Sequence, residues 1–273
     1  MQPKYLFLAA DGPRKENQLD IVKGKECKEW VLAQIDWDCE VQTLFRNENL
    51  GCGLAVSGAI TWFFKHVEMG IILEDDCLTT SGFYHFCSYF LDQFTYREDV
   101  MHISGGAFLH ERLVKSGDYY FSKYPFCWGW ATWKRSWEKF NYSLIDAEDG
   151  IKNLDEDEHE YWLKILSALR SNKLDSWAFR WNFALWMNNG KSLVSRTNFV
   201  KNIGFDPKAT HTKSINSYYN KIAIKESVQR IFHDPLTDKI NHKLDRIVFE
   251  RYNLGILSFW DRLLKKVTKY GNS

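Results

Sequence analysis

The sequence predicts an α/β fold in which helices cover both faces of a largely parallel sheet. Short apolar runs alternate with segments of helical spacing through roughly the first 104 residues, and this alternation is typical of parallel sheets. Hydrophobic residues make up 45% of the 273 residues, which is enough for one sizeable core. Polar loops follow several of the predicted strands, where ligands of such sheets lie.

The first predicted strand is the apolar run at residues 4–10, which an Asp-Gly-Pro turn at residues 11–13 ends. Helical spacing follows over residues 18–35. It places five apolar side chains on one predicted face: Leu19, Val22, Trp30, Val31 and Ile35.

The same alternation continues after this helix. A turn-rich loop at residues 47–53 precedes a helix through Ala59, Trp62, Phe63 and Val67. The remaining predictions of this half are strands at residues 41–45, 70–73 and 100–104 and a helix at residues 83–94.

The second half is less regular. Amphipathic spacing predicts helices over residues 133–140 and 158–169, and an aromatic helix over 177–187. Residues 146–160 are acidic and read as an exposed connection, and residues 192–200 read as extended. We predict one domain over residues 1–213 and a basic helical extension over residues 214–273.

Charge and cysteine usage narrow the functional classes. A net charge of +1 gives no global basis for nucleic-acid binding. The six cysteines show neither zinc-finger nor redox spacing, and no apolar run is long enough to span a bilayer. The chain begins almost directly with a strand, so we expect no targeting segment and a reducing, cytosolic setting.

Three adjacent carboxylates, Glu74, Asp75 and Asp76, directly follow the apolar strand at residues 70–73. Adjacent carboxylates repel one another, so a cation or strong donors must lie near them. Hard divalent ions bind carboxylate and phosphate oxygens together. The triplet therefore predicts a site for Mn²⁺ or Mg²⁺ and a diphosphate, with a solvated turn as the alternative.

The run IILEDDCLTTSGFYHFCSYFL resembles the metal-binding segment of the N-acetylglucosaminyltransferase I family. The order of other landmarks is similar: ADGPR at residues 10–14, ISG at 103–105, FCWGW at 126–130 and SRT at 195–197. Residues 4–212 also resemble a bacterial group of hemolysin-like sugar transferases, whose endings are close to NIGF at 202–205 and ATHT at 209–212.

The resemblance implies a GT-A fold: a half-Rossmann arrangement with a mixed, mostly parallel central sheet, flanking helices and a C-terminal helical extension. It implies transfer, by inversion, of a hexosyl or N-acetylhexosaminyl group from a nucleotide sugar, with uracil the expected base. The acceptor would be a glycan or a lipid-linked glycan, as in polysaccharide biosynthesis.

The resemblance also implies roles for single residues. Asp76 would bind the metal, and Glu74 and Asp75 would lie near the donor ribose and the metal's waters. His211 would complete the metal or diphosphate site, with a structural histidine as the alternative. The residues expected beside the nucleotide and the diphosphate are Asp11, Arg14, Arg46 and Asn49.

The catalytic base is the weakest part of the match. Inverting transfer needs a carboxylate that takes the proton of the acceptor hydroxyl. Asp175 matches the first acid of the family's pair, whereas Ser176 replaces the second and Ala178 stands where bacterial relatives carry Asp. Asp175 serves as the base, or caps the helix that begins at Trp177, or the chain is impaired.

Aromatic residues supply a candidate sugar platform, because flat rings cover the apolar faces of sugars. Trp128, Gly129 and Trp130 are the best candidates, and Gly lets a ligand approach the backbone closely. Trp177 is a further candidate. For each ring taken singly, packing in the core is the alternative.

Two rival functions stay open. A degenerate transferase that only binds carbohydrate or nucleotide fits the missing acid at Ala178. A nucleotidyltransferase ranks lower, because residues 11–15 contain one Gly where a triphosphate-binding loop needs several.

The C-terminal segment at residues 256–270 has an apolar stripe beside a basic face. From residue 221 to the end, 11 Lys and Arg stand against 6 Asp and Glu. An interfacial helix on the inner face of the plasma membrane has this composition. A final helix packed on the domain and a homodimer contact are the alternatives.

Overall fold

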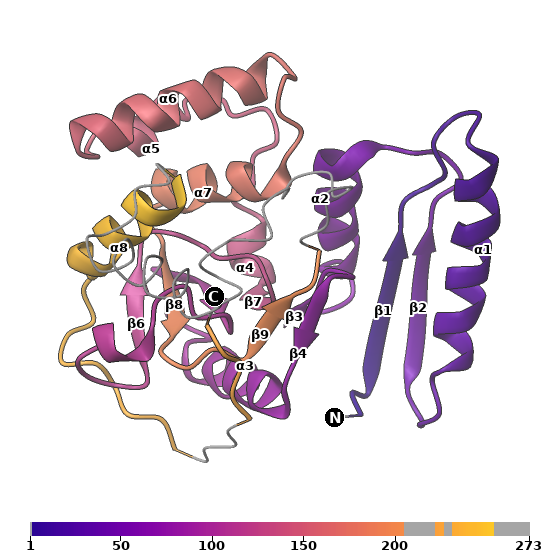
Figure 1. Ribbon diagram of the computed structural model, residues 1–273, viewed down its shortest axis with the longest axis horizontal. Coiled ribbons are helices and arrows are strands. Elements are labelled where there is room, and N and C mark those ends of the chain that lie inside the picture. Colours follow the sequence, from indigo (N-terminus) through magenta and orange to yellow (C-terminus); the bar gives the residue numbers. More distant parts are fainter. Residues whose placement is uncertain (1, 205–221, 227–230, 254–273) are drawn as a thin grey trace, which may run out of the picture.

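The protein has a mixed α/β architecture with a mixed central sheet flanked by helices (Figure 1). The computed structural model describes residues 2–204, 222–226 and 231–253. Five strands form the central sheet, and their spatial order is β3 (Met69–Ile72), β7 (Trp130–Trp133), β5 (Val100–Ser104), β8 (Lys191–Ser195) and β6 (Tyr119–Ser122).

The predicted mostly parallel order is wrong for this sheet. Within it, β5 and β8 pair in parallel, and the pairs β3–β7, β7–β5 and β8–β6 are antiparallel. The cause is visible along the chain: β5, β6 and β7 follow one another with only the short 3₁₀ turn Glu111–Leu113 between them. Parallel neighbours need long crossover connections, which this stretch does not contain.

The N-terminal segment forms a separate unit of β1 (Tyr5–Ala10), α1 (Gln18–Ala33) and β2 (Glu40–Phe45), with the two strands in parallel. It lies at the β3 side of the molecule (Figure 1). The ring of Phe63 packs on Phe7 of β1, with ring centroids 5.0 Å apart, and fills the space that Gly70 of β3 leaves open. An aromatic side chain thus lies between the two sheets.

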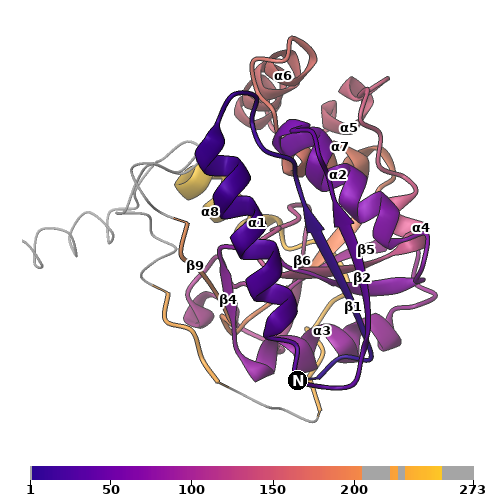
Figure 2. The ribbon, with the colours of Figure 1, turned by 90° about the vertical axis from the view of Figure 1, so that its right-hand side faces the viewer.

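Helix α1 covers the outer side of this unit (Figure 2), but not with the whole predicted face. Leu19, Val22 and Trp30 are 58%, 52% and 64% exposed. Lys28 is the residue that faces the strands, and its ammonium lies 5.3 Å from the centre of the Phe45 ring. The predicted helix is confirmed, whereas three of the five predicted apolar side chains are exposed, and Val31 and Ile35 are partly buried.

The other helices surround the central sheet (Figure 1). The expected helices near residues 54–67, 83–94, 158–169 and 177–187 are confirmed, whereas residues 133–140 hold only one helical turn. The bounds are α2 (Gly51–Phe63), α3 (Ser81–Gln93), α4 (Lys134–Trp137), α5 (Glu148–Ile151), α6 (Glu156–Arg170), α7 (Trp177–Met187), α8 (His242–Val248) and a π-helical turn (Phe249–Asn253).

A second two-stranded sheet pairs β4 (Cys77–Thr79) with β9 (Val200–Asn202) in antiparallel fashion. The sequence predicted an extended segment at residues 192–200, which the structure divides into β8 and β9. Strand β4 follows the acid triplet directly, so the β4–β9 pair holds this turn against the second half of the chain.

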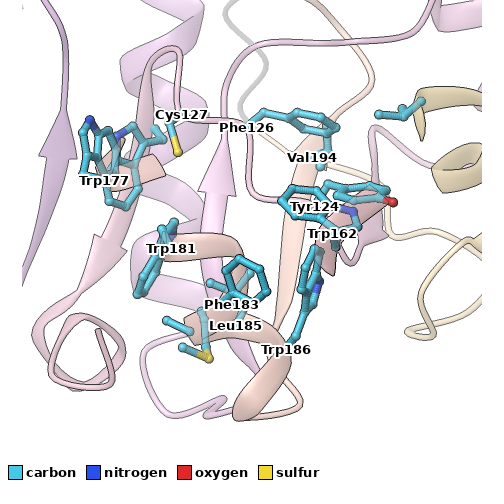
Figure 3. Packing of buried hydrophobic residues seen from close by; sticks show 14 of the residues in the cluster. Tyr124, Phe126, Cys127, Trp162, Trp177, Trp181, Phe183, Leu185, Trp186 and Val194 are labelled. Atoms are coloured by element: carbon cyan, nitrogen blue, oxygen red, sulfur yellow. The ribbon is translucent and has the colours of Figure 1, made fainter. Parts of the chain in front are cut away.

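The core is aromatic and centres on α7. Trp162 and Trp186 meet edge to face with ring centroids 4.7 Å apart (Figure 3). His102 is fully buried; its Nε2 lies 3.1 Å from the Phe126 carbonyl, and its Nδ1 accepts from Trp181 Nε1 at 3.1 Å. Burial lowers the pKa of His102 to about 3, so this imidazole is a neutral member of the core.

Residues beyond the predicted boundary at 213 also join the core. Asp245 of α8 is fully buried; its carboxylate accepts from Ser122 Oγ at 2.6 Å and from the Lys123 N–H at 2.9 Å. Lys123 forms an ion pair with Glu158, which is also fully buried. The prediction that residues 146–160 form an exposed connection is confirmed for most of the segment, but it is wrong at Ala147, Ile151 and Glu158, which are buried.

Two predictions fall outside the described residues. His211 and the predicted amphipathic helix at residues 256–270 lie there. Among the residues that the structure describes, no helix is long and apolar enough to cross a membrane.

Candidate functional site

The loop after β1, at residues 11–14, and the loop after β2, at residues 46–53, meet at the N-terminus of α2. The Asp11 carboxylate, just after β1, accepts from the backbone N–H of Leu50 at 3.0 Å and of Gly51 at 3.1 Å. The Asn49 side chain donates to Asp11 Oδ2 and to the Gly12 carbonyl, each at 3.0 Å. Because the first N–H groups of a helix lack partners within it, a carboxylate stabilises this end.

A second carboxylate reaches the same helix end from far along the chain. Asp175 Oδ1 accepts from the Gly53 N–H at 2.9 Å. The approach is so close that a side chain at Gly53 would overlap this carboxylate, and Gly51 adopts a φ of +77° beside it. Asp175 nevertheless belongs to the exposed residues of the site.

This contact changes one of the two expected roles of Asp175. The side chain of Ser176, not of Asp175, caps α7 by accepting from the Phe179 N–H at 3.4 Å. Asp175 caps α2 instead. The sequence could not show this, because the two partners are 122 residues apart.

The loop after β3, at residues 74–77, lies close to the loops after β1 and β2 around Cys52. Burial, and then the negative charges of Glu74, Asp175 and Asp11, raise the pKa of the Cys52 thiol to about 11. Carboxylates from the loop after β1, from the loop after β3 and from the segment before α7 are therefore close enough to act on one thiol at the start of α2. The predicted convergence of the loops after β1, β2 and β3 is confirmed.

Glu74 is the most perturbed acid of the triplet. Burial raises its pKa to about 7, and the charges of Asp76 and Asp75 add to this effect. The protonated form of Glu74 is stabilised first by burial and second by the crowding of three carboxylates in one turn. A cation placed among them would relieve the same repulsion.

Asp76 is held by the strand that pairs with β4. Its carbonyl accepts from the Ile203 N–H at 2.8 Å. A side chain at Gly204 would overlap the Asp76 carboxylate, so the glycine leaves the room that this carboxylate needs in its position. The Cys77 thiol donates to Asp76 Oδ1 at 3.5 Å.

The acid triplet offers carboxylate ligands for a divalent ion, but the described residues form no complete shell of protein ligands around one. Within the described part of the chain, no group of three or more His, Cys, Asp or Glu could hold a metal. Mg²⁺ often takes one or two carboxylates and completes its shell with phosphate and water oxygens. Asp76 and its neighbours in the triplet can supply that number of ligands.

The two predicted arginines lie at different places. Arg14 is 69% exposed at its side chain and pairs with Asp20 of α1 through a 2.6 Å contact. Arg46 lies beside α2, where its Nη2 would be 3.0 Å from a Cβ atom at Gly58. Arg14 thus faces α1 and Arg46 faces the middle of α2, and their contacts with a nucleotide stay predictions.

The predicted aromatic platform separates into core and cavity. Trp130 is fully buried and Trp177 is 2% exposed, and their rings stack with centroids 5.5 Å apart. Neither presents a ring face to solvent, so core packing describes both. Trp128 lines a cavity of about 300 Å³, and Gly129 turns the chain beside it with a φ of +65°.

Sequence reasoning missed Tyr142. Its hydroxyl would lie 3.0 Å from a side-chain carbon at Gly53, which places it beside the Asp175 carboxylate. The guanidinium of Arg180, 3% exposed, covers the Tyr142 ring at 4.2 Å from its centre. One signal was present: the Gly-Cys-Gly start of α2 indicates close approach by another segment.

Comparisons with known proteins add no relative. No protein-family model matches the chain, and no curated protein shows significant similarity to it.

Proposed function

We propose that this protein is a metal-dependent glycosyltransferase of the GT-A type that uses a nucleotide-sugar donor, with uracil the expected base. One observation carries the proposal: the acid turn Glu74-Asp75-Asp76 lies beside a helix end where two other loops converge. A cluster of carboxylates suits a diphosphate that binds through a divalent metal ion, because such ions take carboxylate and phosphate oxygens together.

The reaction needs three tasks from the site. The acceptor hydroxyl attacks the anomeric carbon, the bond from that carbon to the diphosphate breaks, and the hydroxyl proton moves to a base. Mn²⁺ or Mg²⁺, when bound, would offset the negative charge of the departing diphosphate. Asp76 would hold that ion, and Asp11 and Asn49 would shape the loop that faces the nucleotide.

Asp175 is the proposed base. Its Oδ1 is oriented by the Gly53 N–H, and its residue is exposed, so an acceptor can reach the carboxylate. A fixed and accessible carboxylate meets the geometric need of general base catalysis. A glycan or lipid-linked glycan is the proposed acceptor.

A second candidate is a degenerate transferase that binds nucleotide or sugar without turnover. The role of Asp175 as a cap of α2 favours it, because that contact gives the residue a structural function. Ser176 likewise serves as the cap of α7.

The experiment compares the wild-type protein with Asp76→Ala. Binding of UDP would be measured by calorimetry with Mn²⁺ and with chelator, and donor hydrolysis by release of UDP. We expect wild-type binding that needs Mn²⁺, and a loss of at least tenfold in Asp76→Ala with unchanged circular dichroism. Asp36→Ala, an exposed carboxylate outside the site, is the matched control. Equal binding by Asp76→Ala in chelator would exclude the metal assignment.

A further inference from the structure

The cavity beside Trp128 is closed on one side by residues 222–226. We propose that it binds one sugar unit of the acceptor and that residues 222–226, here called the strap, are its specificity-determining wall. The assignment to an acceptor rests on the proposed transferase function. The binding of a sugar in the cavity does not.

The cavity lies next to the acid turn. Val200 and Asn202 of β9 line it, and Asn202 pairs with Cys77, the residue after Asp76. The Ile203 N–H then donates to the Asp76 carbonyl at 2.8 Å. A sugar in the cavity would therefore lie beside β9, the strand that pairs with β4 directly after Asp76, the proposed metal ligand.

The walls of the cavity combine rings, aliphatic groups and amides. Phe108 and Trp128 line it together with Val200, and the strap contributes Ile222, Ala223 and Ile224. Asn198 and Asn202 add amide groups, and Gly106 leaves room where a side chain would stand. Rings beside amides match a pyranose, which has an apolar face and a rim of hydroxyls.

Size and charge narrow the ligand further. The cavity of about 300 Å³ is at the lower limit of ligand pockets, which suits a single ring better than an oligosaccharide. Among the described residues that line it, none is acidic and Lys201 is the one that carries a charge. These features favour a neutral or acidic sugar over an amino sugar with a free ammonium group.

The strap is fastened at both of its described ends. The Asn198 side chain donates to the Ile222 carbonyl at 3.1 Å, and the Lys225 N–H donates to the Asn198 carbonyl at 2.9 Å. Lys225 forms an ion pair with Glu111 at 2.6 Å. Glu226 accepts from the Ser81 N–H at 3.0 Å at the start of α3. These hydrogen bonds and this ion pair hold the strap in one position against the cavity.

Two variants would fill the cavity from opposite sides. A Cβ atom at Gly106 would lie 3.3 Å from the Trp128 carbonyl oxygen, a tight contact that a shift of a few tenths of an ångström relieves, so Gly106→Val adds bulk into the cavity at the cost of a small backbone adjustment. Ala223→Trp adds bulk from the exposed strap. Gly24→Val is the matched control, because a Cβ atom at Gly24 on α1 would meet nothing within 4 Å.

The probes are methyl β-D-glucopyranoside, methyl β-D-galactopyranoside, methyl α-D-mannopyranoside and methyl N-acetyl-β-D-glucosaminide. Saturation-transfer NMR without nucleotide or metal would measure their binding. We expect at least one glycoside to bind wild type and Gly24→Val, with at least tenfold weaker binding to Gly106→Val and Ala223→Trp. UDP binding with Mn²⁺ would be unchanged in all four proteins.

Every other outcome contradicts either the sugar site, its assignment to the acceptor, or the transferase proposal. No glycoside bound by wild type, or full binding by both filled variants, would overturn the sugar site while the transferase proposal stands. Displacement of the glycoside by UDP-glucose with Mn²⁺ would assign the cavity to the donor and overturn the acceptor assignment. Glycoside binding without any nucleotide binding would reject the transferase proposal and leave the sugar site supported.

Discussion

At the scale of single residues, Asp175 has two separable roles. One oxygen holds the start of α2 through the Gly53 N–H, and the carboxylate as a whole is the proposed proton acceptor. An amide keeps an oxygen for the first role but cannot take a proton in the second. Asn at this position therefore isolates the chemistry from the structure.

We predict that Asp175→Asn lowers kcat by roughly 100-fold or more and leaves donor affinity unchanged, because a general base acts in the transition state. Its free energy of unfolding should change by less than about 1 kcal/mol, the usual worth of a helix cap. Steady-state kinetics and urea unfolding would check both. Unchanged kcat would move the base to another residue and favour the binding-protein alternative.

Tyr142 shows why single residues of the site escaped sequence reasoning. No spacing connects it with Gly53 or Asp175, and its position depends on the Arg180 guanidinium stacked on its ring. By contrast, Glu74 to Asp76 could be identified because a buried strand and a polar turn are adjacent in the chain. A sequence pattern can identify the residues of one loop. The residues from distant elements that contact this loop can be identified only in the structure.

At the scale of an element, α2 connects the carboxylate of β1 with the carboxylate before α7. Substitutions at two of the glycines in α2 can test this connection. Both Gly53 and Gly58 lie within α2, where glycine is about 1 kcal/mol less favourable than alanine. They differ in what an added methyl group would meet.

We predict opposite effects on stability. Gly58→Ala should raise the free energy of unfolding by up to about 1 kcal/mol, because only the flexible end of Arg46 must shift. Gly53→Ala should lower it by about 1–3 kcal/mol, because the methyl group overlaps Asp175 Oδ1. Urea unfolding of both variants, and of Gly53→Ala with Asp175→Ala, would measure this.

The double variant gives the decisive comparison. If the loss at Gly53 comes from Asp175, then removing that carboxylate should restore part of the lost stability. Strictly additive losses would show that another neighbour of Gly53 is responsible.

Elements were predicted better than their pairing. The strand at residues 4–10 and the helix at 177–187 have strong local patterns, and both are present as β1 and α7. Strand β7 was missed because all four of its residues are buried, so it shows no alternation. Since β7 and β6 were not expected, the antiparallel pairings of the central sheet could not be predicted.

At the scale of the whole molecule, the buried cluster at Asp245 makes stability depend on pH. Burial raises the pKa of this carboxyl to about 7, and Lys123 and Glu158 are its charged neighbours. The folded protein thus keeps a proton that the unfolded chain releases above about pH 4. The stability from this group is fully present below that pH and is lost as the pH rises through 7.

We predict that Asp245→Asn gains stability relative to wild type between pH 4.5 and 8, by at most about 4 kcal/mol. The contribution of His102, whose lowered pKa acts in the opposite direction, is common to both proteins and cancels in the difference. Urea unfolding across this range would measure the gain, with Asp36→Asn as the control. A difference that does not vary with pH would show that Asp245 keeps an ordinary pKa.

The same cluster has a consequence for synthesis on the ribosome. Ser122 and Asp245 are 123 residues apart in the chain, yet they meet in one buried hydrogen bond. At 5–20 residues per second, roughly 6–25 s separate the appearance of the two partners. Throughout that interval the nascent chain displays β6 without α8, so an edge rich in tyrosine and phenylalanine is open to chaperones before the fold can close.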